Sequence, residues 1–508
     1  GQYNTALGAE ALTNNTTASS NTAVGYQSLY TNTTGASLSA VGVGALYANT
    51  TGSNNVAMGT SSLVSNTTGA SNTGLGRDAL RSNTTASNNT AVGHQAAYNN
   101  TTGTENTTLG RVSLLTNTTG NENTAIGSVA LYYNTTGSNN VAVGRQALNN
   151  NTTASNNTAV GFQALLANTT GTANTAIGRN SLQANTTADD NTASGMYSLY
   201  TNTTGASNTA HGRSALFSNT TGSSNVSVGA QALENNTTAG NNVAVGYQAG
   251  FSNTTGAQNT MLGNTAGRSA TTGSYSTFLG RDSGYYITTG TKNVILGSYN
   301  GNQGSLDIRT SNSNIVLSDG DGNPRIHVDS NGKTFVGPEN TNNATFHVHS
   351  LSNYWTAILY NLSNADVTNV LCRHHWATGS NTATQISFRQ SNGNEVGSIK
   401  SNGSSTSYNT SSDYRLKENV DYTWDATTRL KQLKPARFNF IADADTTVDG
   451  FLAHEAQAVV PECVTGAKDA VDADGNAVMQ GIDQSKLVPL LVKTIQELEA
   501  RITALEGE

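Results

Sequence analysis

The sequence contains little charge, few aromatic residues, and very little proline or cysteine. Of its 508 residues, 11% are charged, 6% are aromatic, five are proline and two are cysteine. This composition argues against a conventional globular enzyme, in which charged residues make up about 25% of the chain. No segment is basic enough to indicate a nucleic-acid partner, and no apolar run is long enough to span a membrane. We therefore expect neither nucleic-acid binding nor membrane insertion.

The two cysteines, Cys372 and Cys463, are expected to be free thiols, as in a protein that folds in a reducing cytoplasm. No N-terminal apolar segment indicates a signal peptide. Because Gly1 already lies inside a repeat, we expect a missing N-terminal region to attach this chain to its partners. We expect no cofactor.

Gly, Asn and Thr are abundant, and they are concentrated in residues 1–303. That region contains nine Lys or Arg and eight Asp or Glu, so the net charge of −7 comes from the C-terminal part of the chain. An Asn-Thr-Ala-hydrophobe-Gly word recurs there eighteen times, every 17 residues, from Gly8 to Gly297. Spacing without insertions or deletions indicates identical units stacked on one another.

Each repeat contains two short apolar runs, such as Ala159-Val160 and Ala164-Leu165, each ended by Gly or Asn. We interpret them as two strands and two turns per coil of a parallel β-solenoid. Eighteen coils about 4.8 Å apart would give a rod of roughly 85 Å. The fold class is therefore mainly β.

A coil with about four apolar residues in 17 was expected to bury too little core alone. Three chains around one axis would let their Leu and Val ladders pack together, which predicts a parallel homotrimer. The Asn-Thr-Ala-Val-Gly word also resembles the head repeats of trimeric autotransporter adhesins. That resemblance implies a trimeric β-roll, although those repeats are shorter.

Two recurring features of the repeats have alternative interpretations. Asn-Thr-Thr matches the N-glycosylation pattern, but we favour Asn and Thr ladders that bond neighbouring turns. Arginine follows the repeat glycine in alternate coils. We favour the explanation that this spacing reduces repulsion between like charges on a solvated face. The alternative is a row of positive charges that binds an anionic polysaccharide. These arginines are Arg77, Arg111, Arg145, Arg179 and Arg213.

Residues 304–411 break the period and contain hairpin signals such as Asp319-Gly320 and Asn331-Gly332. We expect a β-rich neck and tip that contacts the host surface, because aromatic rings stack on sugars while Arg and His bond hydroxyls or carboxylates. The alternative is that the tryptophans form the core of a small β domain. The candidate receptor-binding residues are Tyr354, Trp355, Arg373, His374 and Trp376.

His347-Val348-His349 places two imidazoles on one face of a predicted strand. At a three-fold axis, six such groups could bind a transition metal octahedrally. The favoured interpretation is two solvated histidines opposite the buried Phe346 and Val348.

The character of the chain changes at Ser411-Ser412, after which an acidic module of more usual composition begins. Ser412 and Lys417 lie five residues apart and could form a dyad in which a neutral amine takes the serine proton. The surrounding words, Ser412–Asn419 and Gly450–Gln457, resemble the C-terminal intramolecular chaperone domain of phage tail spikes, tail fibres and endosialidases.

This resemblance implies a module that holds three chains together while the fibre folds and then cuts itself off. It implies Ser412 as nucleophile, Lys417 as general base and Ser411-Ser412 as the cleaved bond. Of the two adjacent serines, only Ser412 is followed directly by an Asp and lies five residues before Lys417. The alternative is a solvated charged turn.

Four further elements are expected in residues 412–508: a helix at 422–433, a strand at 436–440, and a strand followed by a helix at 448–457. A final coiled coil is expected at about 488–506, since apolar residues recur at two heptad positions. These residues are Val488, Leu491, Ile495, Leu498, Ile502 and Leu505. Ile or Val at one position with Leu at the other favours a dimer by itself. We give more weight to the shared three-fold axis.

The sequence therefore predicts three regions: a β-solenoid shaft at 1–303, a neck at 304–411, and a chaperone module at 412–508. We expect a phage tail fibre or tail spike subunit, assembled in the host cytoplasm and located in the virion tail. Its expected partners are two further copies, a host glycan or protein, and other tail proteins. Its only catalysis would be one self-cleavage per chain. The alternatives are a polysaccharide depolymerase tail spike and a bacterial trimeric adhesin.

Overall fold

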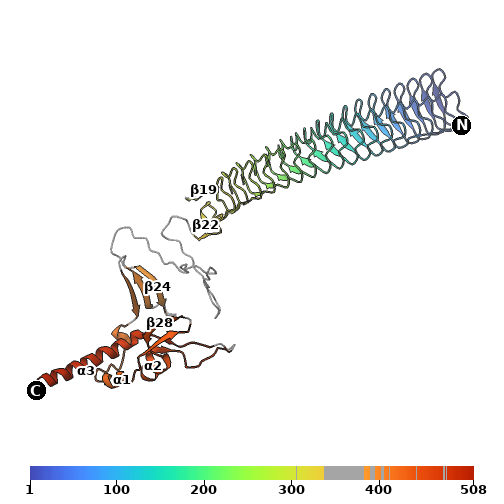
Figure 1. The fold of residues 1–508 in the computed structure, drawn as a ribbon. Helices are drawn as coiled ribbons and strands as arrows, with labels where there is room; N and C mark the ends of the chain where they lie inside the picture. The colour runs from blue at the N-terminus through green and yellow to red at the C-terminus, as the bar shows by residue number, and fades with distance from the viewer. Residues whose placement is uncertain are drawn as a thin grey trace. The chain divides into compact units, whose positions relative to one another are not determined.

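The computed structural model describes residues 1–304, 306–336, 383–389, 395–401, 405–410, 412–441, 443–472, 475 and 477–507. The chain divides into two compact units, Gly1–Thr356 and Ala357–Glu508. Figure 1 shows the first as a long stack of coils and the second as short strands with the helices α1 (Ala426–Leu430), α2 (Ala453–Val459) and α3 (Val488–Glu506).

Each coil of the first unit contributes one strand of three residues. These strands pair in parallel with the same residues of the adjacent coils, so that Ala159 lies opposite Ala142 and Ala176. The predicted parallel β-solenoid is confirmed. The strands are β1 (Thr5–Leu7), β2 (Thr22–Val24), β3 (Ser39–Val41), β4 (Val56–Met58), β5 (Thr73–Leu75), β6 (Thr90–Val92), β7 (Thr107–Leu109), β8 (Thr124–Ile126), β9 (Val141–Val143), β10 (Thr158–Val160), β11 (Thr175–Ile177), β12 (Thr192–Ser194), β13 (Thr209–His211), β14 (Val226–Val228), β15 (Val243–Val245), β16 (Thr260–Leu262), β17 (Thr277–Leu279) and β18 (Val294–Leu296).

The prediction of a second strand in each coil was wrong. The Ala-Leu run lies in a turn, and its leucine adopts a left-handed backbone, as at Leu165 with φ of 53°. Its amide still donates to the next coil, from Leu165 N to Ser181 O at 2.9 Å. The hydrogen-bond ladder therefore continues around the turn without strand geometry.

Each coil buries its own small core. Ala159, Ala164 and Leu165 are all 0% exposed in the single chain. Burying a leucine stabilises a fold by about 1.5–3 kcal/mol, which offsets the roughly 1–2 kcal/mol cost of its left-handed backbone. The expectation that the leucine ladders need three chains to be buried was therefore wrong, because two alanines and one leucine fill the narrow interior of the coil.

Buried asparagines form a continuous ladder through the shaft. Asn151 Nδ2 donates to Asn134 Oδ1 at 2.8 Å and to the Ala154 carbonyl at 2.9 Å, and Asn168 Nδ2 donates to Asn151 Oδ1 at 3.0 Å. Asn151 belongs to an Asn-Thr-Thr word and is 0% exposed, so it is closed to glycosylation. The predicted ladder is confirmed.

The repeat glycine permits the close stacking of coils. Gly161 has φ of +135°, and a Cβ there would lie 2.6 Å from the carbonyl oxygen of Gly178. Both the backbone conformation and the contact exclude any larger residue.

The last three coils exchange the positions of large and small residues. Met261, Phe278 and Ile295 replace the central alanine of the strand, and glycine replaces the buried leucine. A Cβ at Gly284 would lie 2.8 Å from the Phe278 ring. The volume of the core is thereby conserved.

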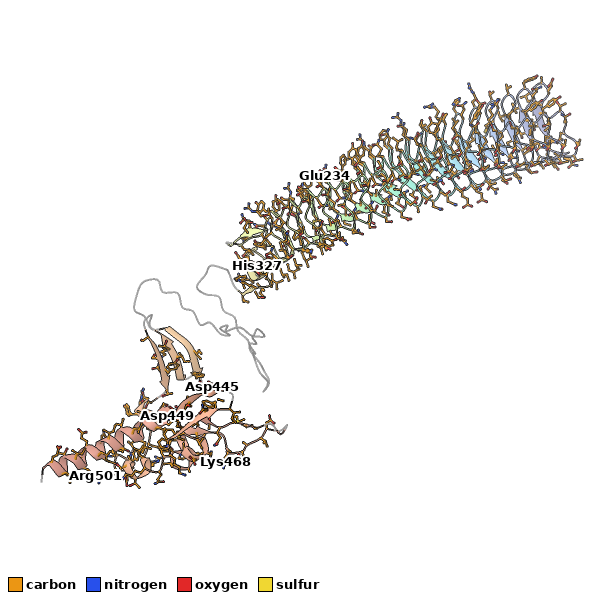
Figure 2. All side chains as sticks on the ribbon, in the orientation of Figure 1. Glu234, His327, Asp445, Asp449, Lys468 and Arg501 are labelled. Atoms are coloured by element: carbon orange, nitrogen blue, oxygen red, sulfur yellow. The ribbon has the colours of Figure 1, made fainter. Side chains whose placement is uncertain are left out.

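The length of the repeat changes after β18. The next strand that pairs with it in parallel lies 21 residues further along the chain. The asparagine ladder follows the same step, since Asn314 N donates to Asn293 Oδ1. This longer coil includes a small hairpin, and two antiparallel strands then extend the main sheet, as the hairpin signals predicted. In order, the strands are β19 (Asn302–Gln303), β20 (Leu306–Asp307), β21 (Ile315–Ser318), β22 (Pro324–Val328) and β23 (Thr334–Val336). His327 of β22, labelled in Figure 2, is buried and stacks on Phe335.

The described residues of the second unit form three small sheets and several helices, and they include a compact core. Ala426, Ala456, Val460, Leu487 and Leu490 are buried in that core. The helix expected at 422–433 is shorter than predicted, since only α1 forms there. The predicted strand at 436–440 is confirmed, and so are the strand and the helix that follow it. The elements are β24 (Ala383–Arg389), β25 (Glu395–Ser401), β26 (Thr406–Thr410), η1 (Tyr414–Leu416), α1 (Ala426–Leu430), β27 (Ala436–Phe440), β28 (Asp443–Gly450), α2 (Ala453–Val459), η2 (Pro461–Cys463), β29 (Val464–Thr465), β30 (Gly481–Ile482), η3 (Gln484–Leu487) and α3 (Val488–Glu506).

Candidate functional site

Ser412 and Lys417 lie in direct contact. Lys417 Nζ lies 2.8 Å from Ser412 Oγ, within hydrogen-bond distance. The 3₁₀ helix η1 lies between them, and Lys417 N donates to the Tyr414 carbonyl at its end. One tight turn therefore brings together two side chains five residues apart.

Asp413 fixes the start of that turn. Its carboxylate accepts from Arg415 N at 2.9 Å and forms a two-point ion pair with the Arg415 guanidinium, at 2.9 and 2.8 Å. These hydrogen bonds lower the pKa of Asp413, so it stays ionised well below neutral pH. Sequence reasoning did not identify Asp413 as the cap of this turn, although a helix-capping residue type was present.

The dyad is open to solvent in the single chain, since both of its residues are exposed. The apolar side chains near it are exposed as well: Tyr414 by 82%, Leu416 by 72% and Tyr422 by 80%. Exposed apolar residues gathered in one segment are typical of an interaction surface.

The dyad segment leads into α1, which α3 holds in place. Glu497 of α3 accepts from Ala426 N at 2.9 Å and from Thr427 N at 2.7 Å. The Thr427 hydroxyl also donates to it, at 2.6 Å. The bond from that hydroxyl and the two backbone bonds lower the pKa of Glu497. The terminal helix thus caps the first helix of the module.

Several predicted residues lie outside the described residues. These are Ser411, the receptor-binding candidates Tyr354, Trp355, Arg373, His374 and Trp376, the metal candidates His347 and His349, and Cys372. Within the described ranges, no group of three or more His, Cys, Asp or Glu is placed to hold a metal ion. Cys463 is a buried free thiol, and burial raises its pKa.

Two of the arginines of alternate coils, Arg145 and Arg179, contact the aromatic residue between them. The guanidinium carbons of Arg145 and Arg179 lie 5.7 and 6.0 Å from the centre of the Phe162 ring. Cation–π attraction to the ring between them can offset part of the repulsion that remains between these two like charges. Both explanations of these arginines stay predictions.

No helix in the described part of the chain has the length and apolarity needed to cross a bilayer.

A long β-solenoid with a separate small module that carries an exposed Ser-Lys pair defines a fibre-type protein with a C-terminal accessory domain.

Residues 412–465 match the model of the protein family described as the chaperone of endosialidase. The match begins at Ser412 and includes the whole dyad. The resemblance predicted from the sequence is confirmed: this is a tail-fibre-like chain with a C-terminal chaperone module. Comparison with curated proteins and with solved structures returned no match.

Proposed function

We propose that this chain is a phage tail fibre or tail spike subunit whose C-terminal module trimerises it and then cuts itself off before Ser412. The observation that carries the proposal is the 2.8 Å contact between Lys417 Nζ and Ser412 Oγ inside the segment that matches the chaperone family. The long shaft and the proposed contact with a host-surface glycan or protein belong to the same proposal.

The proposed reaction begins with attack by Ser412 Oγ on the carbonyl carbon of the residue before it. Lys417 takes the hydroxyl proton and returns it to the Ser412 nitrogen as the peptide C–N bond breaks. The product is an ester between the residue 411 carbonyl and Ser412 Oγ. Water then hydrolyses the ester, leaving a new carboxylate on residue 411 and a free amine and hydroxyl on Ser412.

This chemistry requires a neutral lysine, and desolvation is what favours the neutral amine. The described residues of the single chain leave Lys417 exposed, and in this proposal another copy supplies the cover. The exposed Tyr414 and Leu416 beside the dyad are suited to pack against another copy. Cleavage would then depend on assembly, which would prevent the module from leaving an unassembled chain.

Intact-mass measurement tests the proposal. We expect the full chain to release residues 412–508, and Ser412→Ala to remain whole. Lys417→Arg should also remain whole, since arginine keeps the charge but does not give up its proton near neutral pH. Lys431→Ala, an exposed lysine of the same module, is the matched control and should cleave normally.

Two outcomes would change the assignment. Cleavage that persists in Ser412→Ala and stops in Ser411→Ala would move the nucleophile by one residue. An intact wild-type chain under conditions where it assembles would leave a chaperone without protease activity.

A further inference from the structure

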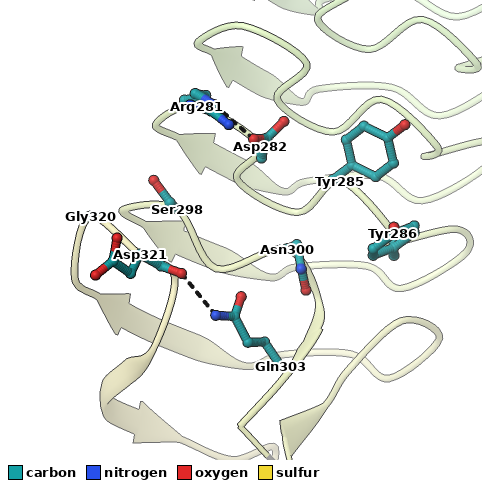
Figure 3. A pocket seen from close by; sticks show the side chains of 9 residues that line it. All are labelled: Arg281, Asp282, Tyr285, Tyr286, Ser298, Asn300, Gln303, Gly320 and Asp321. Atoms are coloured by element: carbon teal, nitrogen blue, oxygen red, sulfur yellow. Dashed lines mark hydrogen bonds and ion pairs between the residues drawn. The ribbon is translucent and has the colours of Figure 1, made fainter.

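A hollow lies where the regular shaft ends. Its volume is about 440 Å³, and its lining comes from three successive turns of the chain: the loop after β17, the loop after β18, and the β21–β22 turn (Figure 3). The coil that follows β18 is longer than 17 residues, so the regular stacking that closes the surface elsewhere is interrupted here.

One wall of the hollow carries a fixed aromatic pair. Tyr285 and Tyr286 lie edge to face, with ring centroids 4.8 Å apart. Arg268 Nη1 donates to the Tyr285 hydroxyl at 3.1 Å, and its guanidinium lies over the Tyr285 ring. Tyr285 is therefore held in place, while Tyr286 remains 50% exposed and presents a ring to the hollow.

The floor provides amide groups in fixed positions. Asn300 Oδ1 accepts from Asn302 N at 2.9 Å, which fixes the orientation of its side-chain amide. Gln303 Nε2 donates to the Asp321 carbonyl at 2.8 Å, as drawn in Figure 3. The buried Tyr299, next to Asn300 in the chain, donates to the Leu306 carbonyl at 2.7 Å and anchors the β19–β20 hairpin.

The charges around the hollow disfavour an anionic ligand. Arg281 is paired with Asp282 at 2.9 Å, so its charge is neutralised. The Asp319 carboxylate is already bonded within its own turn, where hydrogen bonds from the Asn323 backbone and from Arg325 lower its pKa to about 2. Asp321 adds a further carboxylate to the lining, which gives the hollow a net negative charge.

We infer that this hollow is a binding site for a neutral saccharide. An exposed tyrosine ring stacks on the apolar face of a pyranose, while the two amides fixed by the backbone and the Asp321 carboxylate bond its hydroxyl groups. The volume fits roughly one or two sugar rings. The inference deepens the proposed host-surface role, since it names a ligand class and a place on the shaft that the sequence did not indicate.

Saturation-transfer NMR on the full chain tests the inference with three neutral probes and one acidic probe. The neutral probes are the methyl glycosides of glucose, galactose and N-acetylglucosamine, and the acidic probe is methyl glucuronide. We expect at least one neutral probe to bind. Tyr286→Ala should weaken that binding about fivefold to tenfold through loss of stacking. Asn300→Ala should weaken it as well, and Tyr286→Phe should retain it.

Tyr247→Ala is the matched control, because Tyr247 is 48% exposed on the shaft but lies outside the hollow. It should bind like wild type. No binding by any neutral probe, binding of the glucuronide alone, or neutral binding unchanged in both Tyr286→Ala and Asn300→Ala would overturn the inference. Self-cleavage measured on the same preparations keeps this result separate from the proposed function.

Discussion

At the scale of single residues, the shaft depends on buried amides that each serve three partners. Replacing Asn151 by alanine would leave Asn134 Oδ1 without its donor and Asn168 Nδ2 without one of its acceptors. The Ala154 carbonyl would lose one of its two amide donors and keep the other, Asn140 Nδ2. An unsatisfied buried polar group costs about 1–3 kcal/mol. We therefore expect Asn151→Ala to lower the free energy of unfolding of the shaft by at least that amount, measured by urea denaturation.

The neighbouring Asn150→Ala is the control. Its side chain is half-buried and makes no hydrogen bond to any described residue. It should change stability by less than about 0.5 kcal/mol. An equal loss in both variants would mean that the ladder adds no specific stability.

The repeat predicted some of these residue roles and not others. Glycine and asparagine indicate turns because their backbone or side-chain chemistry suits a turn, so Gly161 and the Asn-Thr-Thr ladder could be predicted. Leucine gives no such signal. Leu165 adopts a left-handed backbone because the coil is narrow and the turn must bring an apolar side chain inside. That requirement arises only because the coil closes on itself, and a local sequence pattern carries no information about this closure.

At the scale of elements, the cap between α3 and α1 makes the module sensitive to pH. Hydrogen bonds lower the pKa of Glu497 in the folded chain, so its stabilising effect is complete above its ordinary pKa and is lost as the pH falls through the lowered value. We expect Glu497→Gln to lower the melting temperature of the module at pH 7. The difference should shrink as the pH falls below about 4.

Glu499→Gln, an exposed glutamate on the same helix, is the control for charge alone and should leave the melting temperature unchanged. Calorimetric scans at pH 7, 5 and 3 make the measurement. A loss of equal size at pH 3 and pH 7 would contradict an ionised cap.

The candidate dyad and the hollow differ in how far the sequence predicted them. Ser412 and Lys417 are close in the chain, so a short turn is enough to bring their side chains into contact. The sequence motifs that resemble the chaperone family also indicate this segment. The hollow combines Tyr286, Asn300 and Asp321 from three turns of the chain. Their proximity depends on the change from 17 to 21 residues between coils, and the depth of the resulting gap depends on packing.

At the scale of the whole molecule, α3 carries the main argument for assembly. Its heptad residues stay exposed in the single chain, with Ile495 at 63% and Leu498 at 42%. An adjoining face of the helix is already occupied, because Leu490 and Thr494 are buried. The shaft buries its own core, so the exposed stripe on α3, together with the apolar residues near the dyad, is what another copy would cover.

We therefore expect the uncleaved chain, held intact by Ser412→Ala, to sediment at three times its mass of 52.5 kDa. Adding Ile495→Asp should dissociate it, since a charge at a buried heptad position is unfavourable. Gln496→Ala, which changes an exposed polar residue beside the stripe, should leave the assembly intact. A dimer would mean that the Ile and Leu pattern of the helix sets the number of chains. A monomer would remove the proposed cover from Lys417, and the dyad would then need another source of desolvation.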